Sequence, residues 1–111
     1  MANTFKLKTF DGSSTAANAA MTVYTAPAAT TTVVLGITLA NITTSTIYAT
    51  VLIENNDGDN VNFLKGVPIP TGSSIEVMSG NKLILETSVV LTVQSDTANS
   101  LDTSLSIMEQ A

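Results

Sequence analysis

The residues of this chain that could do chemistry are carboxylates, hydroxyls and four lysines, because the sequence holds no His, Cys, Arg or Trp. Histidine, cysteine and arginine carry much of the general-base, thiolate, metal-ligand and phosphate-binding chemistry of proteins. Without His, an activated Ser or Thr would need a Lys as its base. Lys65 stands in no Ser-x-x-Lys motif, and Lys82 follows Ser79 at that spacing only within a stretch that has turn signals. The sequence therefore predicts no catalytic residue, and we do not expect an enzyme.

Paired carboxylates are the remaining route to acid–base catalysis. Glu54, Glu76 and Glu86 fall on the polar phase of alternating segments, which is typical of strand residues that face water. The densest acidic stretch, residues 55–60, offers oxygens to Ca²⁺ but fails the EF-hand pattern, since Ile53 stands where the first carboxylate belongs. Asn, Asp and Gly are also what tight turns require, and we favour that interpretation. We expect no metal and no cofactor.

Length and charge bound the possible partners. A chain of 111 residues fits one domain. Its net charge is −5, with only four lysines to neutralise phosphates, so we expect no nucleic-acid partner. No apolar run approaches the roughly 20 residues of a membrane span, and the N-terminus lacks the apolar region of a signal peptide, so we expect no membrane partner either. Since only 12% of residues are charged, we expect other subunits to cover part of the surface.

Period-2 alternation dominates the sequence and predicts an all-β fold. In residues 31–40 one face is expected to be buried, and it carries Val33, Leu35, Ile37 and Leu39. Residues 47–53 repeat the pattern with Ile47, Ala49, Val51 and Ile53. About eight short antiparallel strands with turns every 8–12 residues predict a single β-sandwich, of jelly-roll or Ig-like type.

Three connections between these strands have turn signals. Asp57-Gly58 predicts a hairpin with a type I′ turn, which needs positive φ at both central residues. Ser79-Gly80-Asn81 predicts a second hairpin, between residues 75–78 and 83–85. The two prolines in residues 67–72 exclude a central strand and predict an extended crossover between the sheets.

The chain is expected to divide into an N-terminal strand or arm with its loop, residues 1–20, and a β-sandwich domain, residues 21–111. The first segment carries little core material, and ordering it would cost backbone entropy unless it pairs with something. We therefore expect it to dock on a neighbouring subunit or on a shell protein, by adding a strand to an exposed sheet edge. Its expected assembly contacts are Phe5, Leu7 and Phe10.

The order of motifs along the chain carries a family resemblance. Residues 22–34 (TVYTAPAATTTVV), 37–41 (ITLAN), 70–74 (PTGSS), 83–86 (LILE) and 91–95 (LTVQS) follow one another in this order. With them the chain resembles, from Thr22 to Glu109, a family of small virion proteins of tailed bacteriophages, common in marine and cyanobacterial phages. The family offers no motif that would assign a binding residue.

The resemblance implies a structural protein of a phage particle, part of a virion assembled in the host cytoplasm. The most direct expectation is a capsid decoration (cement) protein that binds the shell and its own copies. Its partners would be the major capsid protein or other virion proteins, and capsid symmetry favours a trimer. The alternatives are a small neck, tail or fibre component, or a carbohydrate- or host-binding β-module.

Overall fold

The computed structural model describes residues 3–78 and 82–111, and it confirms the all-β prediction. Within these ranges the chain forms strands, turns and loops and no helix, so none of the described segments is a helix able to cross a membrane. The strands are β1 (Asn3–Phe10), β2 (Met21–Thr25), β3 (Thr31–Asn41), β4 (Ile47–Glu54), β5 (Asn60–Ile69), β6 (Ser74–Glu76), β7 (Leu83–Leu85), β8 (Val90–Ser95) and β9 (Leu101–Gln110).

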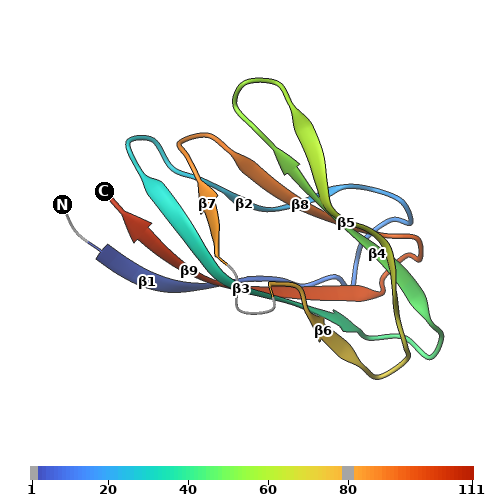
Figure 1. Cartoon of the computed structure of the whole chain (residues 1–111). Coiled ribbons are helices and arrows are strands. Elements are labelled where there is room, and N and C mark those ends of the chain that lie inside the picture. Colours follow the sequence, from blue (N-terminus) through green and yellow to red (C-terminus); the bar gives the residue numbers. More distant parts are fainter. Residues whose placement is uncertain (1–2, 79–81) are drawn as a thin grey trace.

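The strands form two antiparallel sheets that pack face to face (Figure 1). The first sheet has the order β1-β9-β3, with β6 and β7 both on the far side of β3, and the second has the order β2-β8-β4-β5. When β6 and β7 are counted as one interrupted edge strand, the described residues form eight strands in two four-stranded sheets. This arrangement is a jelly roll, the architecture used by many viral capsid and lectin domains.

The core lies between the sheets and is built from aliphatic side chains. Ile47, Ala49 and Val51 of β4 are fully buried, as the alternation predicted, and Ile53 packs against them partly buried. The first sheet contributes Leu101, Leu105 and Ile107 of β9, among others. Burying a side chain of this size contributes about 1.5–3 kcal/mol, so these strands hold the two sheets together.

The buried face of β3 changes side at a β-bulge, which corrects the prediction for residues 31–40. Ile37 and Leu39 are buried as predicted, but in the first half of the strand Val34 is buried while Leu35 is 37% exposed. The pairing with β9 shifts register between Val34 and Gly36, so Leu35 is the extra residue. Because side chains alternate with period 2, one inserted residue exchanges the two faces of the strand.

β6 and β7 do not form the predicted hairpin with each other. Both pair antiparallel with β3, at Thr38–Ala40 and at Thr32–Val34, so they run in the same direction. The turn expected at Ser79–Asn81 lies outside the described residues. Between the two strands, the Glu76 carboxylate accepts hydrogen bonds from the backbone N–H groups of Ile37 (3.2 Å) and Met78 (3.0 Å). The Glu76 carboxylate thus takes the place of a backbone acceptor for β3 at the point where the edge strand is interrupted.

The acidic segment forms a hairpin, but with a different turn from the one predicted. The Gly58 N–H donates to the Asn55 carbonyl (3.1 Å), and Gly58 alone in the turn has a positive φ, of 94°. Asp57 keeps a negative φ, so the connection is not type I′. The Asp57 carboxylate instead accepts a hydrogen bond from the Asp59 N–H (3.0 Å), which stabilises a five-residue loop.

The proline-containing segment is also corrected. Val67, Pro68 and Ile69 belong to β5, where Pro68 pairs with Tyr48 of β4. β5 is the edge of the second sheet, where a missing backbone N–H is tolerated. The crossover to the first sheet begins only at Pro70, after the buried Ile69.

Candidate functional site

The expected assembly contacts lie on β1, which occupies an edge of the first sheet. β1 pairs with β9 of the same chain along its whole length, from Asn3 opposite Gln110 to Phe10 opposite Thr103. Phe5 and Leu7 point away from the second sheet and are 71% and 69% exposed. Phe10 instead packs, partly buried, against the chain's own core. The structure therefore leaves two of the three predicted contacts free on the surface.

A row of apolar side chains crosses the outer face of the first sheet from Phe5. Phe5 lies directly opposite Met108, Met108 opposite Val33, and Val33 opposite Ile84. Directly paired residues share one face of a sheet, so these four side chains form a continuous band. The alternation in residues 31–40 placed Val33 in the core, so the sequence did not predict its part in this band. The pairing of β7 with β3 has no local signal in the sequence either.

The loop that follows β1, residues 11–20, is hydrogen-bonded to the connection between β8 and β9 and to the adjoining ends of these strands. The Gly12 N–H donates to the Asp102 carboxylate (2.8 Å), and Thr15 exchanges hydrogen bonds with Asn99. The Asn18 N–H donates to the Ser95 carbonyl (2.8 Å). These contacts fix the path of the chain from β1 in the first sheet to β2 in the second.

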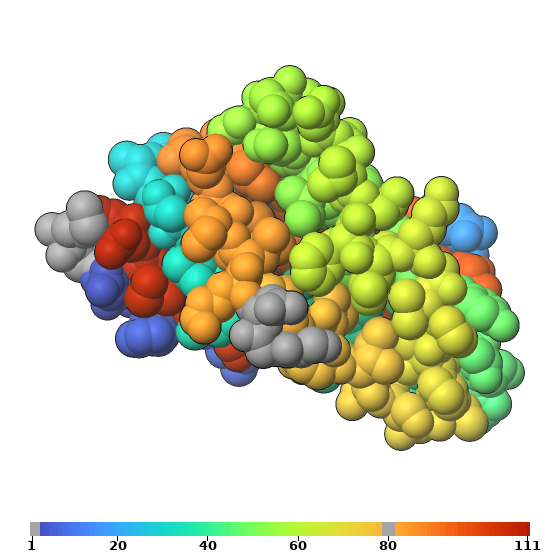
Figure 2. Space-filling view, in the orientation of Figure 1, coloured from blue at the N-terminus to red at the C-terminus, as the bar shows by residue number. Residues whose placement is uncertain are grey.

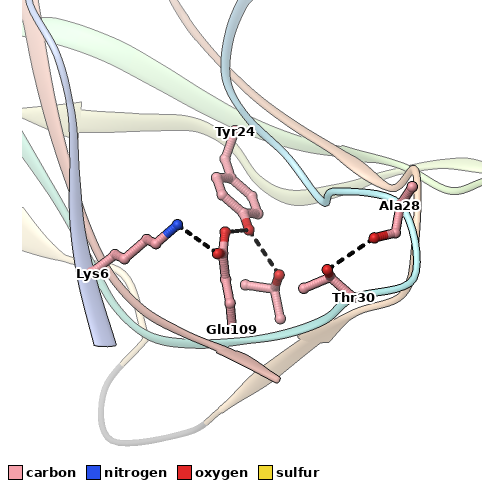
Figure 3. Close-up of polar contacts among 6 residues, drawn as sticks. Lys6, Tyr24, Ala28, Thr30 and Glu109 are labelled. Carbon is pink, nitrogen blue, oxygen red and sulfur yellow. Dashed lines mark hydrogen bonds and ion pairs between the residues drawn. The ribbon is translucent and has the colours of Figure 1, made fainter. Parts of the chain in front are cut away.

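On its inner side β1 carries Lys6 and Lys8, and Lys6 belongs to a polar network that links the sheets (Figure 3). The Lys6 ammonium lies 2.8 Å from a carboxylate oxygen of Glu109 on β9. The other oxygen of Glu109 accepts a hydrogen bond from the Tyr24 hydroxyl of β2. That hydroxyl also shares a hydrogen bond with Thr32 of β3 (2.8 Å). Four strands from both sheets meet in this network.

The network shifts two acid–base equilibria. Burial of the Tyr24 ring and its hydrogen bond to the Glu109 carboxylate raise the pKa of Tyr24 to about 12. Hydrogen bonds from Lys6 and Tyr24 hold the pKa of Glu109 below its ordinary value. The Glu109 contribution to stability is therefore present above the ordinary carboxyl pKa and is lost as the pH falls through the lowered value.

Tyr24 gives the protein a predicted sensitivity to alkali. Its pKa is higher in the folded state, so its stabilising contribution is complete below pH 10 and is lost as the pH rises from 10 to 12. We expect Tyr24→Phe to be less stable than the wild type at neutral pH and to lose less stability between pH 10 and 12. Urea denaturation at a series of pH values measures this, and equal alkaline losses in both proteins would contradict it.

The acidic residues do not assemble into a reactive site. Among the described residues, no group of three or more acidic side chains is placed to hold a metal ion. Glu76 binds the backbone of the first sheet, and Glu109 is paired with Lys6. Glu86 follows β7, which is separated from Glu109 on β9 by β3.

Comparisons with known proteins concern the fold of the chain. No protein-family model and no curated protein sequence matches the chain. Among solved structures, it is similar to a chain from the disulfide-linked pili of Bacillus endospore appendages, with a TM-score of 0.53 and 14% identity over 97% of this chain and 84% of that one. It is also similar to a chain from the acid-stable capsid of Helicobacter pylori bacteriophage KHP30, with a TM-score of 0.52 and 13% identity over 98% and 87% of the two chains.

These similarities establish a shared β-sandwich architecture. At 13–14% identity they concern the fold alone. Both neighbours come from assembled structures, a pilus and a capsid. The chain thus shares its β-sandwich fold with a pilus chain and a phage-capsid chain.

Proposed function

We propose that the protein is a structural subunit of a phage particle, and more specifically a capsid decoration (cement) protein. The observation that carries this proposal is the uncharged apolar band of Phe5, Met108, Val33 and Ile84 on the outer face of the first sheet. A band of this kind on an inert domain is suited to contacts with other subunits. The family resemblance from Thr22 to Glu109 and the capsid fold of the phage KHP30 neighbour support the same function.

The proposed partners are the major capsid protein and further copies of this chain, in a trimer. Phe5 and Leu7 are the proposed contacts on the N-terminal segment, with Phe10 contributing where the core leaves it uncovered. Many copies on a symmetric shell bind through small contacts whose effects add by avidity, so no single contact needs to be strong.

Quantitative mass spectrometry of purified particles tests this proposal. A decoration protein should be present in a copy number comparable to that of the major capsid protein. A neck, tail or fibre component would have a far lower copy number. Such a low number would contradict the decoration function but not the structural function. Absence of the protein from intact particles would contradict the structural function itself.

The carbohydrate-binding alternative would need an exposed aromatic ring on which a sugar could stack, and the hollow that Tyr24 lines with Lys6, Lys8 and Glu109 does not supply one. Tyr24 was one of two tyrosines considered for stacking against a sugar, but its side chain is buried and its hydroxyl is hydrogen-bonded to Thr32 and Glu109. Tyr48 is half-exposed on the outer face of the second sheet, without a neighbouring aromatic residue in the ladder.

A further inference from the structure

The two edges of the first sheet, β1 and β7, carry different side chains. They lie opposite each other across the sheet, at the same position along the strand direction. At one edge, β1 exposes Phe5 and Leu7 on its outer side and carries Lys6 and Lys8 on its inner side. At the other edge lies β7, and the row Phe5–Met108–Val33–Ile84 shows that the two strands are level with each other. They are three strand spacings apart, about 14 Å.

The β7 edge holds an open groove between the two sheets, with a volume of about 450 Å³. Its walls come from β7 and from the β4–β5 hairpin, which lie next to each other on the face shown in Figure 2. Five lining side chains are apolar: Ile53, Val61, Leu83, Ile84 and Val89. Val61 and Ile84 are more than half exposed, so the groove presents apolar surface to a partner.

The charges at the two edges are opposite. Glu86 lines the groove, and the hairpin that forms its other wall carries Asp57 and Asp59 at its tip. Lys82, at the other end of β7, does not line it. The β1 edge holds Lys6 and Lys8, half of the four cations in a chain with a net charge of −5. Lys6 is already paired with Glu109, so Lys8 is the cation that the β1 edge offers to a partner, whereas the groove offers the carboxylate of Glu86.

We propose that the β1 edge of one copy docks against this groove of a second copy, head to tail. Phe5 and Leu7, on the outer face, contact Ile84 at the rim of the groove, and Lys8, on the inner side of β1, lies near Glu86 of the next copy. The two surfaces differ, so the interface is heterologous, and its repetition builds a ring or a chain of subunits. The proposal deepens the structural function proposed above, on which it rests, by naming the receiving surface.

The strand directions support this arrangement. β1 is antiparallel to β9, β9 to β3, and β3 to β7, so β1 and β7 of one copy run in opposite directions. When neighbouring copies are related by rotation about an axis along the strands, as in a cyclic trimer, β1 of one copy therefore meets β7 of the next in the antiparallel direction used throughout this sheet. Strand addition at a sheet edge follows the same geometry.

Sedimentation velocity over a concentration series tests the interface with purified protein. Phe5→Glu disrupts the β1 edge, which we call the head of the subunit. Ile84→Lys disrupts the groove at the β7 edge, which we call its tail. Ile42→Lys is the matched control, because Ile42 is 44% exposed against 55% for Ile84 but lies in the loop after β3, away from the groove. We expect the wild type and the control to self-associate equally and each of the two variants to remain monomeric. Leu7→Glu and Glu86→Lys provide second head and tail variants, and circular dichroism verifies that each is folded.

Mixing the two kinds of variant gives the decisive result. An equimolar mixture of Phe5→Glu and Ile84→Lys retains one intact head and one intact tail, so it should form a 1:1 dimer and nothing larger. A mixture that stays monomeric would overturn the head-to-tail interface, as would a monomeric wild type at every concentration. Either outcome would leave the structural function standing if the protein is found in particles, so the two proposals fail separately.

Discussion

Replacement of Ile37 with alanine should lower the free energy of unfolding by about 2–5 kcal/mol. Ile37 is fully buried between the sheets, immediately after the bulge in β3. Its truncation removes apolar contacts and leaves a cavity that the rigid ladder of β3 and β9 closes only in part. Chemical denaturation monitored by circular dichroism measures the change.

The matched variant is Leu35→Ala, two residues earlier in the same strand. Without the bulge, residues 35 and 37 would share a face and the two substitutions would have similar effects. With the bulge, Leu35 lies on the outer face and is partly exposed, so we expect a loss of about 1 kcal/mol or less. Equal losses at the two positions would show that β3 continues without the change of face.

Replacement of Gly12 with alanine is the second substitution with a large expected effect. Gly12 is buried where the chain leaves β1, and an added Cβ would lie 1.7 Å from the backbone carbonyl oxygen of Leu101. The backbone of Gly12 or that of Leu101 must move to make room. Either shift also strains the hydrogen bond from the Gly12 N–H to Asp102. We expect a loss of about 1–3 kcal/mol, measured by thermal and urea denaturation.

Gly36→Ala is the control for this effect of close approach. A Cβ at Gly36 would meet the Glu76 carboxylate at 3.5 Å, which is an ordinary contact with a movable side chain. The control should therefore be close to the wild type in stability. If Gly12→Ala is equally harmless, the loop after β1 does not pack on β9 as described.

The polar network at the β1 edge and the groove at the β7 edge give the molecule its two distinct sides. Lys6, Glu109 and Tyr24 fasten β1 to the sandwich, so Phe5 and Leu7 are presented from an ordered strand. An ordered contact surface loses less conformational entropy on assembly than a free arm does, which favours binding by edge contacts that are individually small.

Local sequence determined the fold class and part of the core. The alternation in residues 47–53 places Ile47, Ala49 and Val51 inside without ambiguity, because a strand without a bulge has only two faces. The shortage of reactive side chains likewise follows from composition. The turn residues of 54–60 located a hairpin, although the choice among turn types depended on which backbone angles the flanking strands impose.

Tertiary structure alone decided the candidate assembly surfaces. Whether Leu35 or Val34 faces the core depends on a bulge that is set by pairing with β9, about seventy residues away in the sequence. Phe5 and Ile84 share a band only because β9 and β3 lie between β1 and β7. The groove that contains Glu86 exists only where the β4–β5 hairpin meets β7. Period-2 alternation records which residues share a face within one strand, whereas the order of strands in a sheet follows from long-range packing between segments whose local patterns are alike.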